Sequence, residues 1–463
     1  MRTRISEYAA RSGAFVRDEP EMREAVTGAT LAFDGKRRRA YGEVDAEAWR
    51  RWAERVKNHL LTHLDDYLAE AEARLEANGA RVHWAGDAAE ACEIVLSLAS
   101  RLQAASVVKG KSMLTEEIDL NPALESAGIA VYETDLGEYI LQLLEEPPSH
   151  IVGPAIHKTL QQVRALFADR LGTAPHSDPD DLARAARKVL RDAFINADMG
   201  ITGGNFLVAE TGTLALIENE GNIRLTTSLP RVHVALVGIE KLLPRMSDLA
   251  GFLQLTSRAA TGQPVGTFVS LIQGPAIHPG DDGPEEVHVV LVDNGRTRVL
   301  AHAHAWEALR CVRCGACLNT CPVYRQTGGH AYGWVYSGPI GSILDPGLLG
   351  LREALPLPFA SSLCGACGDA CPVRIPIPDL LHAWREEAQA QGLTAWKERA
   401  VLAGLAGVAR WPGLYRAAGK AGTRLGATAL ARRLPMLGEW SRDRALPRPS
   451  ARTFRELWRD GIE

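Results

Sequence analysis

Apolar positions in the first third of the chain change period several times. From Asp45 to Ala77 they recur every three or four residues, which predicts one long amphipathic helix that stops at Asn78-Gly79. Short apolar runs then predict strands at 81–85, 106–109, 129–133 and 150–152, and helical patterns lie between them at 87–102 and 116–127. Strands separated by helices indicate a parallel sheet with helices on its faces.

The second part of the pattern is richer in strands. A helix is predicted over 178–197, followed by strands at 206–210, 213–218, 232–237, 265–272 and 287–292. Asp293-Asn294-Gly295 is a strong turn signal, so we expect 297–300 to be the return strand of a hairpin. Residues 45–300 therefore form an expected α/β domain. An N-terminal arm, residues 1–44, precedes it, and we expect its basic run Lys36–Arg39 to be solvated rather than to dock a partner.

Two further regions complete the expected organisation. Residues 301–394 contain a cysteine-rich segment, in which the Gly- and Pro-rich stretch 328–350 is predicted to be irregular. Residues 395–463 are predicted to be helical with frequent breaks, and they hold 14 Lys or Arg against six Asp or Glu. Five of the ten tryptophans follow residue 380. Aromatic and Arg side chains are enriched at interface cores, so we expect this basic, Trp-rich region to dock a partner.

Composition limits the class of protein. The 463 residues are 46% hydrophobic and 23% charged, which is typical of a soluble globular protein, and a net charge of −4 gives no reason to expect nucleic-acid binding. The start has no apolar run of a secretory signal, and no stretch is long and apolar enough for a transmembrane segment. We expect a cytoplasmic protein without a transmembrane segment.

The cysteines carry the clearest chemical signal. Seven of the eight lie in the range 311–371, and the first motif is Cys311-x2-Cys314-x2-Cys317-x3-Cys321-Pro322. This is the bacterial ferredoxin spacing, in which three thiolates wrap one cubane and the fourth ligates a different cluster. Zinc is the alternative, but a zinc site needs neither three thiolates at this spacing nor a trailing Cys-Pro. Iron–sulfur binding is therefore the prediction.

The second motif, Cys364-x2-Cys367-x3-Cys371-Pro372, lacks one cysteine, because Ser361 stands at its opening position. The crossed ligation rule assigns Cys311, Cys314, Cys317 and Cys371 to cluster one, and Cys321, Cys364 and Cys367 to cluster two. The sequence predicts two [4Fe–4S] clusters. The fourth corner of cluster two has three interpretations: an oxygen ligand from Ser361 or Ser362, an open corner that binds water or substrate, or a missing iron that leaves [3Fe–4S].

Several other residues have a functional and a structural interpretation. Lys109, Lys111 and Ser112 follow a predicted strand, where open parallel sheets place ligand sites, so they are candidates for anion binding or form a solvated turn. Glu133, Asp135 and Glu138 are weaker candidates for paired-carboxylate catalysis. His302 and His304 are expected to be helix-end or surface histidines, and Cys92 a buried structural thiol. Arg313 and Arg374 flank cluster cysteines, where positive charge favours the reduced state.

Several segments together resemble one family. The first cysteine motif, Ser361-Ser-Leu-Cys-Gly-Ala-Cys and Ile201-Thr-Gly-Gly-Asn-Phe-Leu-Val-Ala-Glu-Thr-Gly-Thr are similar to lactate utilization protein B, as are Lys109-Gly-Lys-Ser-Met and Glu133-Thr-Asp-Leu-Gly-Glu. The resemblance implies an α/β domain similar to the sugar-isomerase and CoA-transferase-like fold, followed by a helical two-cluster ferredoxin domain and a helical C-terminal tail. By analogy with that fold's enzymes, Glu210 and Glu218 become candidate nucleophiles.

The resemblance also implies a function. The family is the iron–sulfur subunit of a three-protein system that oxidises L-lactate to pyruvate, so the expected partners are two sister proteins, one with cysteine-rich repeats and one a lone α/β domain. We expect an electron-transferring subunit. No GxGxxG run follows the first strands, which fits a relay better than a self-sufficient dehydrogenase. The alternatives are an enzyme that binds substrate at the open iron of cluster two, and a redox-sensing interaction protein.

Overall fold

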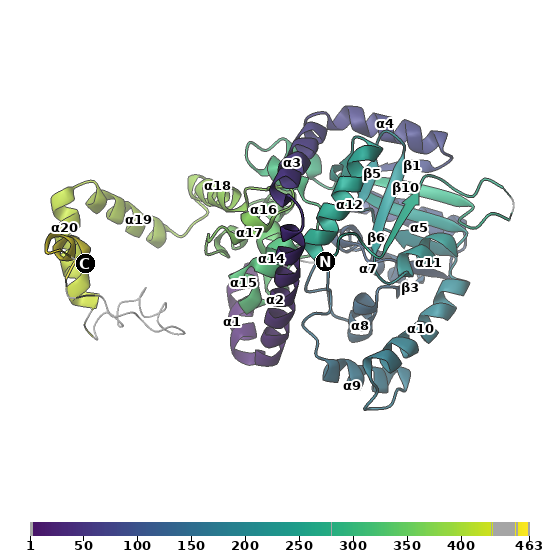
Figure 1. Ribbon diagram of the computed structural model, residues 1–463, viewed down its shortest axis with the longest axis horizontal. Helices are drawn as coiled ribbons and strands as arrows, with labels where there is room; N and C mark the ends of the chain where they lie inside the picture. Colours follow the sequence, from purple (N-terminus) through teal and green to yellow (C-terminus); the bar gives the residue numbers. More distant parts are fainter. Residues whose placement is uncertain (1–2, 279, 427, 429–449, 451, 462–463) are drawn as a thin grey trace. The chain divides into compact units, whose positions relative to one another are not determined.

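The structure, a computed structural model, describes residues 3–278, 280–426, 428, 450 and 452–461. The chain divides into two compact units, residues 1–387 and residues 388–463. The first unit packs the N-terminal arm, the α/β domain and the cysteine segment together (Figure 1). The α/β domain and the cysteine segment, on either side of residue 300, lie within the same compact unit.

A six-stranded sheet forms the centre of the α/β domain. All of its neighbouring strands are parallel. Their order is β1 (Arg81–Ala85), β10 (Glu286–Val292), β7 (Val232–Gly238), β4 (Met199–Thr202), β2 (Ser106–Lys109) and β3 (Ala130–Glu133). The prediction of a parallel sheet is confirmed. The pattern did not reveal β4, because its four residues include a glycine, which strand propensity disfavours.

Apolar side chains cover both faces of this sheet. In β7, Val232, Val234 and Leu236 belong to the core on one face, whereas Ala235 and Val237 belong to the core on the other. Three helices contribute to the first core: α5 (Ala88–Arg101), α6 (Met113–Glu117) and α7 (Leu120–Ser126). Near β2 a third core joins α8 (Leu136–Leu144), α9 (Leu160–Leu171) and α10 (Pro179–Asn196). Burial on both faces is what parallel sheets require.

A second, four-stranded sheet packs over the core that contains Ala235 and Val237. Its order is β8 (Leu242–Leu243), β5 (Phe206–Val208), β6 (Thr213–Glu218) and β9 (Phe268–Ile272), and β6 is antiparallel to both of its neighbours. The predicted strands at 206–210 and 213–218 are confirmed as this hairpin. Two helices, α11 (Asn222–Ser228) and α12 (Met246–Ala260), lie between the strands of the two sheets in the sequence.

Two predicted helices are interrupted. The helix expected over 45–77 is α3 (Ala46–Thr62) and α4 (Leu64–Ala77), with His63 between them in a non-helical conformation. Asp65 and Asp66 lie in the first turn of α4, where carboxylates stabilise a new helix N-terminus. The helix expected over 116–127 is α6 and α7, separated at Asp119, whose φ of 57° is left-handed.

Two predicted strands are wrong. Residues 150–152 form an irregular segment, in which the backbone N–H groups of Val152 and Gly153 donate to Nδ1 of His150. Residues 297–300 belong to helix α13 (Arg296–Leu300) instead of a return strand. Asp293 decides the second case, because its carboxylate accepts the N–H and the hydroxyl of Thr297, both at 2.7 Å. A side chain that satisfies a free helical N–H favours a helix over a hairpin.

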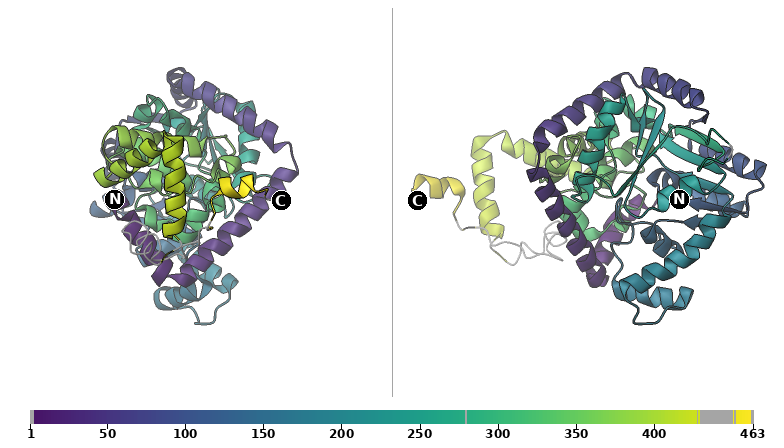
Figure 2. Two further views of the ribbon diagram at one scale, coloured as in Figure 1. Left: turned by 90° about the vertical axis from the view of Figure 1, so that its left-hand side faces the viewer. Right: turned by 45° about the vertical axis from the view of Figure 1, so that its right-hand side comes forward.

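The N-terminal arm is also different from the prediction. It forms α1 (Tyr8–Asp18) and α2 (Pro20–Gly42), and α2 packs against α12 and the helices of the cysteine segment (Figure 1). In Figure 2 the purple N-terminal helices run along the outside of the first unit. Arg37 is buried and pairs with Asp34 at 2.7 Å, while Lys36, Arg38 and Arg39 are exposed. The basic run is therefore only partly solvated.

The cysteine segment is helical in short pieces. Its helices are α14 (Ala316–Thr320), α15 (Pro322–Thr327), α16 (Gly338–Leu349), α17 (Ala366–Ala370) and α18 (Ile377–Ala390). The expectation of an irregular stretch at 328–350 is wrong for its second half, because α16 is a nearly fully buried helix. The second unit contains α19 (Trp396–Ala409), α20 (Pro412–Gly426) and α22 (Phe454–Arg459), and the predicted tail at 427 and 429–449 lies outside the described residues. Across the described ranges, we find no helix that combines the length and the apolar character needed to cross a bilayer.

Candidate metal centre and adjoining cavity

The two cysteine motifs fold into similar loops. In the first, Arg313 (φ 59°) and Gly315 (φ 73°) adopt left-handed conformations just before α14. In the second, Leu363 (φ 55°) and Gly365 (φ 86°) do the same just before α17. Left-handed residues turn the chain tightly, so that the sulfurs on either side of each loop face a common centre. The sequence repeat is thus also a structural repeat.

The structure brings the seven motif cysteines together as two neighbouring groups. One cavity is lined by Cys311, Cys314, Cys317 and Cys371, so that the last cysteine of the second motif joins the first three of the first motif. Burial raises the pKa of Cys367 to about 12, and the neighbouring charges of Cys321 and Cys364 add to the rise. Cys321, Cys364 and Cys367 therefore lie close together and form the second group. This is the division that crossed ligation predicts.

The chemistry of both groups fits a metal cluster. Burial raises the pKa of Cys371 to about 11, and burial together with the charges of Cys311 and Cys314 raises the pKa of Cys317. Clustered, buried thiols can be ionised only beside positive charge, which iron ions would supply. Backbone N–H groups also point at the sulfurs: those of Arg313, Tyr324 and Ile375 donate to Cys311, Cys321 and Cys371 at 3.3, 3.5 and 3.4 Å. Such donors stabilise the charge of a thiolate-bound cluster.

The second group is closer to the surface. Cys364 is exposed, whereas Cys321 and Cys367 are buried. Ser361 lies in the loop before Cys364, and its hydroxyl accepts a hydrogen bond from the N–H of Leu363 at 3.1 Å. Arg385 of α18 holds the same loop by donating to the carbonyls of Pro358 and Ser361 at 2.8 and 3.1 Å.

A network of buried charges lies beside the first group. Arg313 donates to Glu240 at 3.3 Å and lies over the ring of Tyr336, 4.4 Å from its centroid. Arg296 pairs with Glu117 at 2.8 Å and with Glu240 at 2.6 Å. Burial acts to raise the pKa of Glu240. The guanidinium groups of Arg296 and Arg313 outweigh this effect and lower the pKa to about 2. Apart from Arg313, these residues could not be found from the sequence, because they belong to no motif and most of them lie far from the cysteines along the chain.

A cavity of about 290 Å³ adjoins this network at the carboxyl edge of the parallel sheet. Lys111 and Ser112 line it after β2, and Gly203 and Gly204 line it after β4. β2 and β4 are neighbours, and from them the strand order runs in opposite directions, which makes this the topological switch point where open α/β sheets bind ligands. The packing is tight here, since a Cβ added at Gly203 would lie 2.6 Å from the Ser112 hydroxyl.

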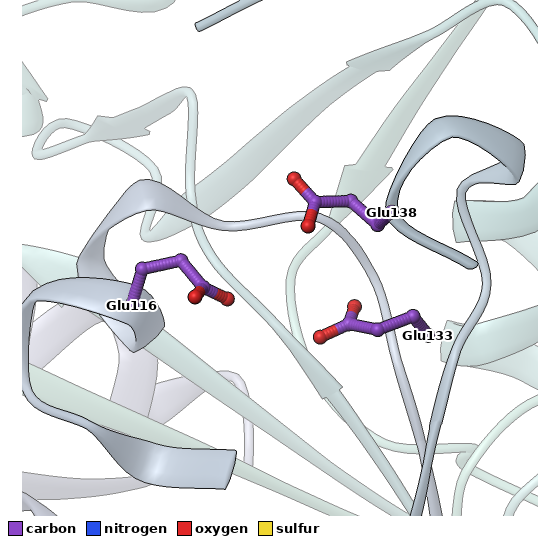
Figure 3. Close-up of side chains that lie close together, drawn as sticks. All are labelled: Glu116, Glu133 and Glu138. Atoms are coloured by element: carbon purple, nitrogen blue, oxygen red, sulfur yellow. The ribbon is translucent and has the colours of Figure 1, made fainter. Parts of the chain in front are cut away.

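Lys109 does not line that cavity. Its ammonium is fully buried and pairs with Glu133 at 2.8 Å and with Glu116 at 3.2 Å. Figure 3 shows the carboxylates of Glu116, Glu133 and Glu138 facing one another. Burial raises the pKa of both Glu133 and Glu138, and the Lys109 ammonium supplies the neutralising charge. The three predicted anion-binding residues are therefore separated, and only Lys111 and Ser112 face the cavity.

The remaining candidates have structural partners. Glu210 accepts the N–H of Met246 at 2.8 Å and does not line the cavity, whereas Glu218 lines it and accepts the N–H groups of Ile223 and Arg224. Cys92 is half-buried and donates to the Ile118 carbonyl at 3.2 Å.

Charged candidates near the cysteines are paired as well. His302 lies at the end of α13, half-buried against Trp384 and 3.1 Å from Glu387, and His304 is exposed, so both positions agree with the expectation of helix-end or surface histidines. Arg374 pairs with Glu47 of α3 at 2.7 Å.

Three family models match consecutive parts of the chain. Residues 68–292 match the LUD domain, 307–375 a 4Fe-4S dicluster domain, and 379–461 the C-terminal region of lactate utilisation protein B. Lactate utilization protein B of Bacillus pumilus (strain SAFR-032) is 42% identical over 450 residues, covering 96% of this chain and 95% of that protein. The chain belongs to the lactate utilization protein B family. The family assignment confirms the resemblance seen in the motifs and accounts for an iron–sulfur domain at the cysteines.

The chain is also similar to an electron transport protein and, distantly, to a protein of known structure. The "Uncharacterized electron transport protein YkgF" of Escherichia coli (strain K12) is 40% identical, covering 96% of this chain and 94% of that protein. A crystallised DUF162 family protein from Deinococcus radiodurans is 16% identical and covers 50% of this chain and 98% of its own. Its TM-score of 0.26 is too low to carry a fold argument.

Proposed function

We propose that this protein is the electron-transferring iron–sulfur subunit of a system that oxidises L-lactate to pyruvate. The observation that carries the proposal is the division of the cysteines into one enclosed group of four and one surface group of three. The dicluster domain match and the names of the relatives, which refer to lactate utilization and electron transport, support it.

The proposal assigns two [4Fe–4S] clusters. Cys311, Cys314, Cys317 and Cys371 hold the first, and Cys321, Cys364 and Cys367 hold the second, with Ser361 as the candidate for a weak fourth ligand. Each cluster supplies one-electron transfer when bound. The two groups are adjacent, since the charge of Cys367 contributes to the raised pKa of Cys317.

The two sister proteins are the proposed partners. An electron has to leave at a point that a partner can reach, and Cys364 is the exposed cysteine of the two motifs. Exposed aromatic residues in the second unit support docking there too: Trp396, Trp411 and Trp458 are 69%, 69% and 70% exposed. Large exposed apolar side chains of this kind are typical of interaction surfaces.

The test is reconstitution. The protein is purified without oxygen, combined with both sister proteins, and given L-lactate while electron paramagnetic resonance follows reduction of its clusters. We expect reduction only in the complete mixture, its loss in Cys311→Ser, and its retention in the matched control Cys92→Ser. Reduction by L-lactate without the sister proteins would instead support the enzyme alternative. A fully loaded protein that stays oxidised in the complete mixture would contradict the proposal.

A further inference from the structure

The cavity at the carboxyl edge of the sheet extends to the first cysteine group. Besides residues that follow β2 and β4, its walls include Val312, Arg313 and Cys314 of the first cysteine loop. Cys314 lines this cavity and also the cavity formed by the four cysteines. A molecule held here beside Arg313 would thus be separated from the first cluster by little more than one cysteine side chain.

The cations that line the cavity have unused hydrogen-bonding capacity. The Arg313 side chain is only 9% exposed, yet its Nη1 has no partner among the described residues. Lys241 also lines the cavity and is half-buried. Lys111 donates to the Ile151 carbonyl, and its ammonium has three protons to donate. Of these three cations, only Arg313 has a buried donor atom without a partner; such a donor costs free energy, so its presence indicates a missing acceptor.

The acidic residues of the cavity, in contrast, already have partners. Glu218 accepts two N–H groups at the start of α11. Asp135 and Glu220 accept N–H groups in the first turn of α8. Glu240 pairs with Arg296 and Arg313. The buried cavity atoms without a partner include Arg313 Nη1 and the hydroxyls of Thr256 and Ser257, and all three can donate to an anion.

We propose that this cavity binds a small organic acid, whose carboxylate is held by Arg313 and Lys241 against the first cysteine group. The planar guanidinium group suits a carboxylate. The walls also contain Leu216, Ile223 and Leu236, which favour a monoanion with a carbon body over doubly charged inorganic phosphate. The inference rests on the proposed function and deepens it by placing the organic acid at named residues of this chain, but binding itself requires no electron transfer and no sister protein.

The experiment is calorimetric titration of the cluster-loaded full chain with L-lactate, pyruvate, acetate and inorganic phosphate. We expect saturable binding of one organic acid per chain, and weaker binding of phosphate. Lys241→Met and Arg313→Met each remove a charge-assisted hydrogen bond and should weaken binding roughly 10- to 100-fold. The matched control Lys188→Met, on the exposed face of α10, should bind as the unmodified protein does.

Two controls separate binding from effects on the cluster. Arg313→Lys keeps the charge but loses the planar fork, so it should weaken carboxylate binding while the iron content stays the same. If Arg313→Met fails to load iron, the affinity of the loaded Lys241→Met protein for the organic acid still tests the proposal. The proposal is overturned if no organic acid binds, if phosphate binds equally well, or if a loaded Lys241→Met protein keeps full affinity. Binding that persists without lactate-driven cluster reduction would contradict the proposed function alone.

Discussion

The two cysteine groups occupy different surroundings. The group of Cys311, Cys314, Cys317 and Cys371 lines an internal cavity, with Arg313, Glu240 and Tyr336 packed together beside it. The group of Cys321, Cys364 and Cys367 has one exposed cysteine and a surface loop held by Arg385. The first group therefore adjoins a cavity, and the second reaches the surface at Cys364. Similar local loops have different surroundings because different elements pack against them.

The largest expected difference is between Cys371→Ser and Cys364→Ser. Cys371 is buried in the four-cysteine group, so its loss should remove the first cluster, about half of the bound iron, and part of the fold's stability. Cys364→Ser should leave the first cluster and its spectrum intact. Iron analysis and electron paramagnetic resonance check both. Loss of the first cluster in both variants would contradict the assignment of Cys371 and Cys364 to different clusters.

The next largest expected effect is on stability, and it compares a charged residue beside the first cysteine group with one that holds the loop of the second group. Glu240→Gln removes the buried negative charge with which Arg296 and Arg313 pair and should lower the free energy of unfolding by about 3–5 kcal/mol. Arg385→Met removes two hydrogen bonds to carbonyls of the surface loop and should cost about 1–3 kcal/mol. Denaturant unfolding of the loaded proteins measures both values. A larger cost for Arg385→Met would mean that the surface loop, not the enclosed region, supports the fold.

A kinetic contrast should follow from exposure. A chelator or mild oxidant should remove iron from the second group first, because Cys364 is exposed whereas Cys314, Cys317 and Cys371 are buried. Iron release and the spectrum are followed together over time. Simultaneous loss of both signals would argue against the difference in accessibility.

The smallest change completes the second group. Ser361→Cys places a thiol at the position that the first motif fills with Cys311, and should slow the loss of iron from the second cluster without altering the first. Ser362→Cys is the matched control, one residue further along the same loop. If only the control slows the loss, the position of the fourth ligand was assigned wrongly.

The α/β domain offers a pH test that is independent of the clusters. His233 of β7 is fully buried, and burial lowers its pKa to about 4 from an unfolded value of 6.5. The neutral form is favoured in the folded state, so its contribution is complete above pH 6.5 and falls by about 1.4 kcal/mol per pH unit down to pH 4. Unfolding measured across this range should be less pH-dependent for His233→Gln than for the unmodified protein. Parallel curves would rule out His233 as the source.

Sequence alone determined the features that depend on local spacing. The cysteine motifs, most of the parallel strands and the family follow from residues that are close together in the chain. The sequence also placed Lys111 and Ser112 after a strand, because the carboxyl ends of parallel strands are regular ligand positions. It failed at 150–152 and 297–300, where single side chains, His150 and Asp293, bond to the backbone and replace a strand.

Tertiary structure decided what surrounds the cysteines. Glu240, Arg296 and Tyr336 are far apart along the chain, and only packing brings them together beside Arg313. Packing also separated Lys109 from Lys111, since one ammonium pairs with buried carboxylates and the other faces the cavity. Burial sets both the cost of a charge and the availability of a donor, and burial is a property of the whole fold, not of any local pattern.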